Sequence, residues 1–263
     1  MCAEFWRKKC FFYKRTDGGV PVQIVKEELM HIGSRLETIG SLVPAGCVLA
    51  DIGTDHAYLP VWLLEQGQIK RAIAGDIAAG PCQAARTTIA QHGLQAKVEV
   101  RLGSGLAVLQ PGEVDCIAIA GMGASTMISI LEADMEVAVA ADLLVLQPMA
   151  GAASLRAWLT SHGWQLVDEE LVDDAPHFYE IISARRGAAP AYSAAQLAVG
   201  PVLLAKQHPL LERQLERQLT TCSQLLAGMA KSERARASAK YKELQALKIA
   251  LEVLQNGESG NSK

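Results

Sequence analysis

Short apolar runs alternate with helix-like segments along the middle of the chain. Five runs of β-branched and aliphatic residues recur from Val48 onward: CVLADIG, RAIAGDI, KVEVRLG, VDCIAIAG and DLLVLQP. Between them, the spacing of apolar residues predicts helices over residues 57–66, 81–92, 125–131 and 153–162. Because buried parallel strands read as near-continuous apolar runs, this alternation predicts an α/β fold, in which helices cover both faces of a mostly parallel sheet.

The pattern changes at the end of this region. The runs GWQLVDEELVDD and HFYEIISARR follow each other without a helix between them, which predicts an antiparallel hairpin that closes the sheet. Gly187 and Pro190 in RRGAAPAYS then interrupt the periodicity and indicate a domain boundary. We therefore expect one domain over residues 31–187 and a second over 188–263.

The second domain has the periodicity of long helices. Apolar residues recur at helical spacing in two sets. The first set is Leu211, Leu215, Cys222, Leu226 and Met229, and the second is Leu244, Leu247, Leu251 and Leu254. Two amphipathic helices that fold into an antiparallel, coiled-coil-like hairpin bury both sets. Residues 1–30 resemble neither a clean helix nor a strand and are predicted to be a disordered extension, and the tail NGESGNSK is predicted to be disordered.

Composition favours a soluble globular protein. Of the 263 residues, 50% are hydrophobic and 20% are charged, which is enough apolar surface for a sizeable core. No apolar run is long enough to cross a membrane, and no convincing signal peptide is present. The six cysteines form no C-x-x-C pair, and the six histidines are scattered, so we expect reduced thiols, a cytoplasmic location and no metal site. No Ser/His/Asp triad is evident either.

Charge is distributed unevenly along the chain. Residues 206–248 contain nine basic and four acidic residues, a net charge of +5, so the rest carries −8 of the total of −3. Solvated helical hairpins often have such a surface. The alternative is a phosphate-binding surface for a nucleic acid, and charge alone does not separate the two.

The first strand ends in the turn VLADIGTDHAYLP. Asp51 and Gly53 stand where a nucleotide-binding loop brings its backbone close to a ligand. A dinucleotide fingerprint has a second glycine where this chain has Asp55, and a carboxylate there repels a pyrophosphate. A cofactor without phosphate and with a cationic centre fits this turn, and S-adenosylmethionine is such a molecule.

Three more strand ends carry features of the same kind of site. The second strand ends in Asp76, where doubly wound proteins place an acceptor for ribose hydroxyls. The third ends in RLGSGL and the fourth in AIAGMGAST, both of which are open glycine turns. Each feature also has a structural explanation, because a D-x-G turn often only connects a strand to a helix and an acid there often caps that helix. A lone histidine such as His56 is more often a cap or a packing residue than a base.

The motifs resemble one known family. RLETIGSLVPAGCVLADIGTDHAYLP, GDIAAGP, VRLGSGL, IAGMGA, LVLQPM, LRAWL and FYEII are similar to segments of the bacterial tRNA (adenine(22)-N(1))-methyltransferase family, often called TrmK. The resemblance runs from about Arg35 to the C-terminus. It implies a Rossmann-like class I methyltransferase with a seven-stranded, mostly parallel sheet and a helical C-terminal domain. It also implies S-adenosyl-L-methionine as cofactor, tRNA as substrate and methylation of adenine N1 in the D-arm region, with a monomer as the expected state.

The resemblance also implies roles for individual residues. The residues expected to bind the cofactor are Asp51, Gly53, Asp76, Gly103, Ser104, Gly105, Ala120 and Gly121. Asp55 and Tyr58 are the expected catalytic residues at the adenine. Gly123 is expected to contact the substrate. The charge of the helical hairpin, and not the resemblance, gives the other residues expected to bind the tRNA substrate, which are Arg234, Arg236, Lys240 and Lys242. The chain departs from the family pattern at Ser104, where an acid is usual, and at Ala124, where a glycine is usual.

Two other functions remain open from the residues alone. The same cofactor could serve an enzyme that methylates a small molecule or a DNA adenine, although such a small-molecule enzyme has no need of the basic helical hairpin. The crevice could also belong to a non-enzymatic module that binds a nucleotide and recruits a protein through the hairpin. That module is expected to bind ligand without methyl transfer.

Overall fold

The computed structural model describes residues 10–15, 21–26 and 30–259. Its strands are β1 (Cys10–Arg15), β2 (Pro21–Lys26), β3 (Val48–Ile52), β4 (Arg71–Asp76), β5 (Val98–Leu102), β6 (Cys116–Gly123), β7 (Leu143–Ala150), β8 (Trp164–Asp174) and β9 (His177–Arg186). The helices that precede β8 are α1 (Ser34–Ser41), α2 (Tyr58–Glu65), α3 (Ala79–Gln91), the 3-10 helix η1 (Gly105–Val108), α4 (Ala124–Ala133), α5 (Met135–Ala140) and α6 (Ala152–Ser161). Those that follow are α7 (Ala194–Val199), α8 (Pro201–Ala205), α9 (Leu211–Met229), α10 (Glu233–Arg236) and α11 (Ala239–Ser259).

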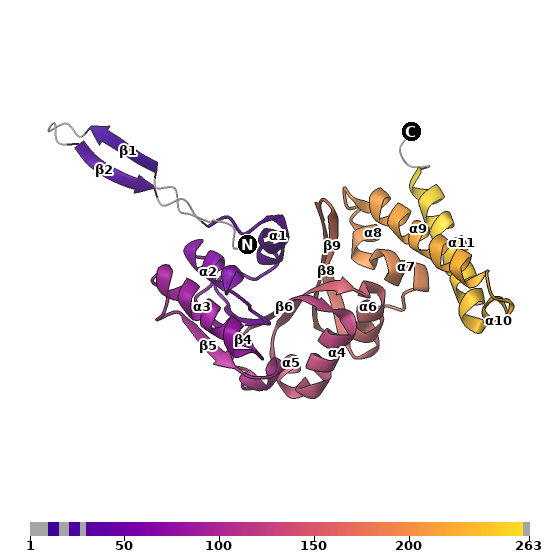
Figure 1. Cartoon of the computed structure of the whole chain (residues 1–263), viewed down its shortest axis with the longest axis horizontal. Helices are drawn as coiled ribbons and strands as arrows, with labels where there is room; N and C mark the ends of the chain where they lie inside the picture. Colours follow the sequence, from indigo (N-terminus) through magenta and orange to yellow (C-terminus); the bar gives the residue numbers. More distant parts are fainter. Residues whose placement is uncertain (1–9, 16–20, 27–29, 260–263) are drawn as a thin grey trace.

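Seven strands form the central sheet, in the order β5-β4-β3-β6-β7-β9-β8 (Figure 1). The five strands from β3 to β7 pair in parallel, and β9 pairs antiparallel with both β7 and β8. The predicted fold class and closing hairpin are therefore confirmed. β3 lies between β4 and β6. From β3 to β5 each new strand is added on one side of β3, whereas β6 and β7 are added on the other side. Ligands of α/β proteins commonly bind at such a switch point, beside the carboxyl ends of the strands.

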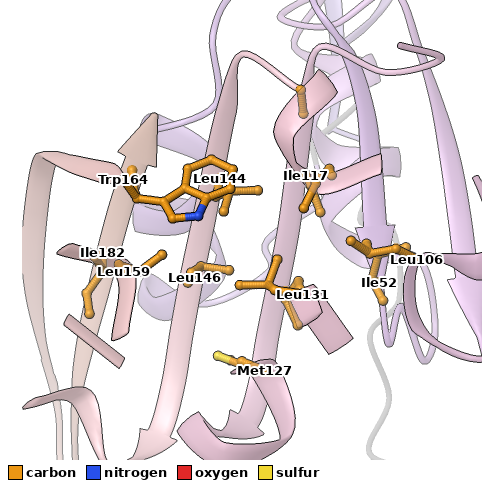
Figure 2. Close-up of a cluster of buried hydrophobic side chains, with 14 of the residues drawn as sticks. Ile52, Leu106, Ile117, Met127, Leu131, Leu144, Leu146, Leu159, Trp164 and Ile182 are labelled. Atoms are coloured by element: carbon orange, nitrogen blue, oxygen red, sulfur yellow. The ribbon is translucent and has the colours of Figure 1, made fainter. Parts of the chain in front are cut away.

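Alternate residues of the central strands enter two separate cores. Ile117 and Ile119 of β6 pack against α4 and α6, whereas Cys116 and Ala118 pack against the helices on the other face. Figure 2 shows the first core, in which Leu131 of α4 lies beside the strands. This period of two explains why β3, β4, β6 and β7 read as continuous apolar runs, since both faces of these strands are buried.

The helical hairpin predicted near the C-terminus is formed by α9 and α11, which pack against each other (Figure 1). Both predicted sets of apolar residues lie in or against one core, which also contains Leu171 of β8 and has Phe178 of β9 packed on it. The helical region is therefore joined to the sheet through the β8–β9 hairpin. The sequence pattern did not predict the short helices α1, α5, α7, α8 and α10.

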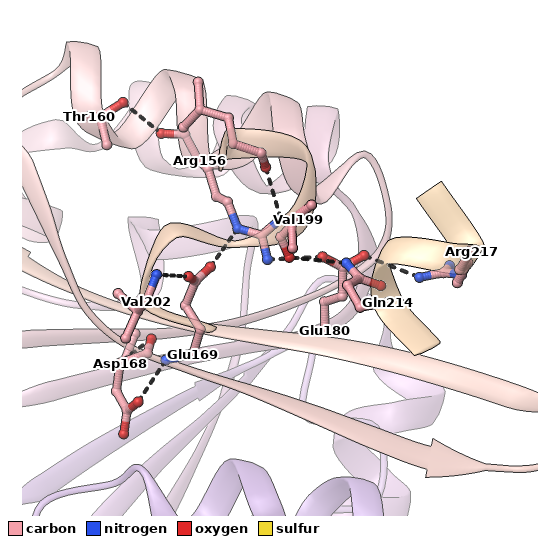
Figure 3. Close-up of polar contacts among 11 residues, drawn as sticks. Arg156, Thr160, Asp168, Glu169, Glu180, Val199, Val202, Gln214 and Arg217 are labelled. Carbon is pink, nitrogen blue, oxygen red and sulfur yellow. Dashed lines mark hydrogen bonds and ion pairs between the residues drawn. The ribbon is translucent and has the colours of Figure 1, made fainter. Parts of the chain in front are cut away.

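A buried ionic network strengthens this junction (Figure 3). Arg156 of α6 is fully buried and donates from Nε to Glu169 of β8 and from Nη2 to Glu180 of β9, the latter at 2.9 Å. Glu169 also accepts from the backbone N–H of Val202 in α8, and Glu180 accepts from Arg217 in α9. Burial lowers the pKa of Arg156, but the two carboxylates outweigh this effect and raise the pKa above its usual value. Arg156 also donates to the Leu197 carbonyl in α7, so the network links the sheet to α7, α8 and α9.

The prediction of a disordered N-terminal extension was wrong for residues 10–15 and 21–26. These segments pair as the antiparallel strands β1 and β2. CFFYKR and PVQIVK are rich in aromatic and β-branched residues, which favour strands, and the sequence between them contains Asp17-Gly18-Gly19, which is typical of hairpin turns. The predicted disordered tail was wrong for residues 256–259, because α11 continues to Ser259. The rest of both predictions lies outside the described residues.

Candidate S-adenosylmethionine and substrate site

The turn after β3 contains several residues with left-handed backbone. Gly53 has a φ of 76°, Asp55 a φ of 52° and Ala57 a φ of 57°. The backbone N–H groups of Gly53 and Thr54 both donate to the carbonyl of Gly75 in β4, which fixes the turn against the neighbouring strand. Non-glycine residues rarely adopt this conformation, and when they do they are often at functional sites.

Asp55 lies at the mouth of this turn with an exposed side chain. Its backbone N–H lies 3.4 Å from Asp76 Oδ2, and Asp76 Oδ1 accepts from the N–H of Ala78 at 2.9 Å. The alternative that Asp55 caps the following helix is contradicted, because the N-cap of α2 is Ala57 and no side chain caps that end. The Asp55 carboxylate is therefore available to a ligand.

An aromatic pair stands beside Asp55. The rings of His56 and Tyr58 stack with centroids 5.1 Å apart and planes 8° apart. Tyr58 begins α2 and is exposed, and His56 Nε2 lies 3.7 Å from Asp55 Oδ1. His56 is thus neither a helix cap nor a core residue, and the pair offers a flat surface of the kind on which nucleobases stack.

Asp51 is the buried acid of the site. Its Oδ2 accepts a hydrogen bond from the Thr54 hydroxyl at 2.6 Å. Burial raises the pKa of Asp51 to about 6, although the Thr54 hydrogen bond and the nearby Arg35 cation act in the opposite direction. A buried carboxylate without a full ionic partner is stabilised by any cationic group that binds next to it.

The predicted residues divide between a cavity and its surroundings. A cavity of about 250 Å³ is lined by Asp51, Gly53, Asp55, Tyr58, Ala120 and Gly121, together with Arg35, Leu36, Thr54, His56 and Leu59. Asp76 lies next to it through its contact with Asp55. Gly103, Ser104 and Gly105 do not line the cavity, but the N–H of Gly103 donates to the carbonyl of Asp76 at 2.9 Å. Gly123 ends β6 and begins α4 without lining the cavity.

Sequence reasoning missed a polar cluster around Arg35, which lines the cavity. Gln147 of β7 is fully buried, and its Oε1 accepts from Arg35 Nη1 at 2.8 Å and from the N–H of Gly121 at 3.2 Å. The Arg35 guanidinium also lies 5.5 Å from the centre of the Tyr179 ring in β9. A glutamine at the end of an otherwise apolar strand, LLVLQP, is the signal in the sequence that could have indicated this cluster.

The four basic residues predicted to bind tRNA lie in another part of the molecule. Arg234 and Arg236 belong to α10, and Lys240 and Lys242 belong to α11. All four are exposed, and Lys240 lies 3.9 Å from Glu243 in a solvent-exposed pair. They form no part of the cavity.

The chemistry of the cavity fits S-adenosylmethionine. Its carboxylates suit a cationic ligand, and the Asp76 carboxylate beside it is a group that can accept hydrogen bonds from hydroxyls. Within residues 10–15, 21–26 and 30–259, no group of three or more metal-binding side chains occurs. In the same part of the chain, no helix has the length and hydropathy required to cross a bilayer.

Comparisons with known proteins agree with this chemistry. A family model described as a methyltransferase domain matches residues 32–182. The tRNA (adenine(22)-N(1))-methyltransferase of Bacillus subtilis is 35% identical over 195 residues, which are 72% of this chain and 82% of that protein.

Solved structures give the same result. The crystal structure of the B. subtilis m1A22 tRNA methyltransferase TrmK superposes with a TM-score of 0.77 at 31% identity, covering 87% of this chain and 100% of that one. A Streptococcus pneumoniae protein in complex with S-adenosyl-L-methionine, a candidate tRNA (m1A22) methyltransferase, has a TM-score of 0.75 at 34% identity. That match covers 86% of this chain and 100% of the other.

Proposed function

Because the chain belongs to the bacterial tRNA (adenine(22)-N(1))-methyltransferase family, we propose that it transfers a methyl group from S-adenosylmethionine to N1 of adenine 22 in tRNA. The observation that carries this proposal is the Asp55 carboxylate. It projects from a left-handed turn at the mouth of the cavity, next to an exposed aromatic pair and bonded through its backbone to Asp76.

S-adenosylmethionine, when bound, supplies a methyl group attached to a sulfonium, and loss of this methyl group turns the sulfonium into a neutral thioether. The protein therefore mainly has to hold adenine N1 in line with the methyl carbon, and no strong base is required. Methylation of N1 places positive charge on the base. We assign to Asp55 the stabilisation of this charge, or acceptance of a hydrogen bond from the exocyclic amine.

The proposed division of labour follows from the positions of the side chains. Asp51, Gly53, Ala120 and Gly121 line the part of the cavity assigned to the cofactor, and Asp76 accepts from its ribose. The turn of Gly103, Ser104 and Gly105 is assigned to its adenine. Tyr58, with His56, provides a stacking surface for the target base, while the Gly123 turn remains a proposed substrate contact.

Adenine N1 lies on the Watson–Crick edge, so the target base must be unpaired and swung out to enter the site. Binding to the rest of the tRNA then depends on phosphate contacts. We assign these contacts to Arg234, Arg236, Lys240 and Lys242, whose side chains are exposed on α10 and α11. The predicted monomer remains part of this proposal.

One assay separates the candidate functions. The purified protein is incubated with radiolabelled S-adenosylmethionine and, separately, with tRNA, DNA and a metabolite pool. The proposal expects label in tRNA only. Label in DNA or in metabolites would instead favour the alternative acceptors, and binding of S-adenosylmethionine without transfer to any pool would favour a non-enzymatic module.

A further inference from the structure

A second cavity lies at the edge of the sheet, between α3 and β5. Its volume is about 570 Å³, and its lining includes Arg71, Arg86, Ala90, Lys97, Glu99 and Val100. We call it the α3–β5 cavity. It shares no lining residue with the cavity that contains Asp51 and Asp55. A volume in this range holds a small organic ligand.

The α3–β5 cavity lies at the opposite end of the strands from the candidate cofactor site. It is lined by the first residues of β4 and β5, whereas Asp76 ends β4. With a rise of about 3.3 Å per residue, the two ends of β4 lie roughly 17 Å apart. Figure 1 shows β5 and α3 on the side of the molecule away from α9 and α11. A ligand in this cavity is therefore remote from both the cofactor turn and the basic helical hairpin.

Basic residues are concentrated around this cavity. Residues 31–187 contain 9 basic and 18 acidic residues, yet residues 70–101 hold five of these nine basic residues and only two of the acids. Three of the five, Arg71, Arg86 and Lys97, line the cavity and are exposed. In an acidic domain, cations gathered around one hollow favour an anionic ligand there.

The three cations keep donors available for such a ligand. Among the residues that the structure describes, none of the three forms an ion pair with a carboxylate. Arg86 Nη2 donates to the Val100 carbonyl at 3.3 Å, and Arg71 Nη2 lies 3.5 Å from the carbonyl oxygen of Glu113. Each guanidinium is thus positioned by one backbone carbonyl, and its other N–H groups remain for an anion.

The acid of the cavity does not cancel these charges. Glu99 accepts two hydrogen bonds from Arg101, both at 2.9 Å, and this pairing lowers the pKa of Glu99 below its usual value. Arg101 also donates to Glu113. Arg101 and its two acids together carry −1, so with the three exposed cations the surroundings of the cavity keep a net charge of +2.

The cavity also offers an apolar wall. Ile89 and Ala90 of α3 line it, together with Ala96 and with Val98 and Val100 of β5. Guanidinium and ammonium groups bind phosphate through charge-assisted hydrogen bonds, and aliphatic side chains can pack against a sugar or a base. This combination fits a nucleotide better than a bare inorganic anion.

We propose that the α3–β5 cavity binds a nucleotide, whose phosphate is held by Arg71, Arg86 and Lys97 and whose sugar or base lies against the aliphatic wall. The nucleotide is either a free mononucleotide or one nucleotide of the tRNA, since both present the same phosphate chemistry. This inference goes beyond the proposed function, because the cavity takes no part in methyl transfer. The competing explanation is that the cations only solvate the surface of an acidic domain.

Calorimetry tests the free source. The probes are the four ribonucleoside 5′-monophosphates and the four nucleosides, each titrated in the presence of S-adenosylhomocysteine to occupy the cofactor site. If the source is free, at least one monophosphate binds, and its nucleoside binds about 10-fold more weakly or worse. Arg86→Gln/Lys97→Gln should weaken that monophosphate about 10-fold or more. Ala90→Trp keeps every cation but fills the cavity with a bulky side chain, and it should weaken the monophosphate similarly.

Filter binding of a tRNA transcript tests the other source with the same variants. If a nucleotide of the tRNA occupies the cavity, both Arg86→Gln/Lys97→Gln and Ala90→Trp should weaken tRNA binding about 10-fold, while S-adenosylmethionine affinity stays unchanged. The matched control is Lys70→Gln/Arg185→Gln, which removes two exposed cations of the same domain that do not line the cavity. It should change neither measurement.

Loss of either kind of binding in both cavity variants, but not in the control, supports the proposal and identifies the source. The proposal is overturned if no monophosphate binds and tRNA affinity is unchanged in the cavity variants. It is also overturned if Ala90→Trp has no effect, or if the control loses as much binding as Arg86→Gln/Lys97→Gln. A parent protein that binds these ligands but methylates no tRNA would overturn the proposed function and leave the nucleotide site standing.

Discussion

The backbone N–H of Asp55 points at the side chain of Asp76, with 3.4 Å between Asp55 N and Asp76 Oδ2. The other carboxylate oxygen of Asp76 accepts from Ala78. Asp76 therefore connects the turn after β3 with the turn after β4. Asp76, which we assign to the ribose, therefore also helps to position Asp55, which we assign to the adenine.

Replacing Asp76 tests this connection. Asp76→Ala should weaken S-adenosylmethionine binding by about 1–3 kcal/mol, because ribose hydroxyls lose a charged acceptor. Asp76→Asn keeps one acceptor oxygen for the Ala78 N–H and should cost less. Calorimetry on the two folded variants measures the difference, and an unchanged affinity in Asp76→Ala would remove Asp76 from the cofactor site.

Asp55→Asn removes the negative charge of this side chain and leaves the backbone conformation of the turn in place. Asparagine tolerates the left-handed conformation at least as well as aspartate, so the φ of 52° should persist. We expect single-turnover methyl transfer to fall about 100-fold or more, with S-adenosylmethionine affinity nearly unchanged, because a neutral amide stabilises the methylated base poorly. A cofactor-saturated variant that transfers methyl at the parental rate would leave this carboxylate without a chemical role.

The basic residues of α10 and α11 are best tested by substitution. Deleting residues 200–263 removes Val202, Gln214 and Arg217, whose hydrogen bonds to Glu169, to the Val199 carbonyl and to Glu180 belong to the buried junction. Changing Arg234, Arg236, Lys240 and Lys242 together to glutamine spares that junction.

This quadruple variant should bind tRNA more weakly and with a log–log salt slope that is smaller by about 3, since four phosphate contacts are lost. Its affinity for S-adenosylmethionine should not change. A variant with lysine at positions 234 and 236 keeps the charge and should retain most of the slope. If the glutamine variant binds and methylates tRNA like the parent, the surface is only a solvated helical face.

Arg156→Met tests the junction between the sheet and the helical region. The substitution leaves Glu169 and Glu180 buried without their shared cation, and we expect the free energy of unfolding to fall by about 3–5 kcal/mol. Urea denaturation measures this loss. Arg185→Met, which removes an exposed cation of β9, should cost less than about 0.5 kcal/mol. Similar stabilities for the two variants would contradict the role of the buried network.

Most of the fold could be predicted because it depends on local periodicity. The runs that became β3 to β9 are buried on both faces or alternate in a hairpin, and the sets of leucines in α9 and α11 repeat at helical spacing. The glycine turns likewise indicated Asp51, Gly53 and Asp76 from the order of strands and loops.

The parts that were missed depend on contacts between distant residues. Arg35 and Gln147 are 112 positions apart, and no spacing rule connects them before the sheet brings α1 next to the end of β7. The junction has the same character, because Arg156 reads as an ordinary surface residue of an amphipathic helix until β8, β9 and α9 pack over it. The N-terminal strands were missed because CFFYKR and PVQIVK are only six residues each and show no clear alternation of apolar and polar residues.

The central claim is methylation of N1 at adenine 22, and mapping the modified nucleotide tests it most directly. A tRNA transcript and a matched transcript with guanine in place of adenine 22 are incubated with the protein and S-adenosylmethionine. Primer extension then locates the product, because a methyl group on N1 blocks Watson–Crick pairing and stops reverse transcription. We predict a stop at position 22 of the first transcript, which requires both protein and cofactor, and no stop in the second. Methylation at a different nucleotide, or equal methylation of both transcripts, would contradict the account.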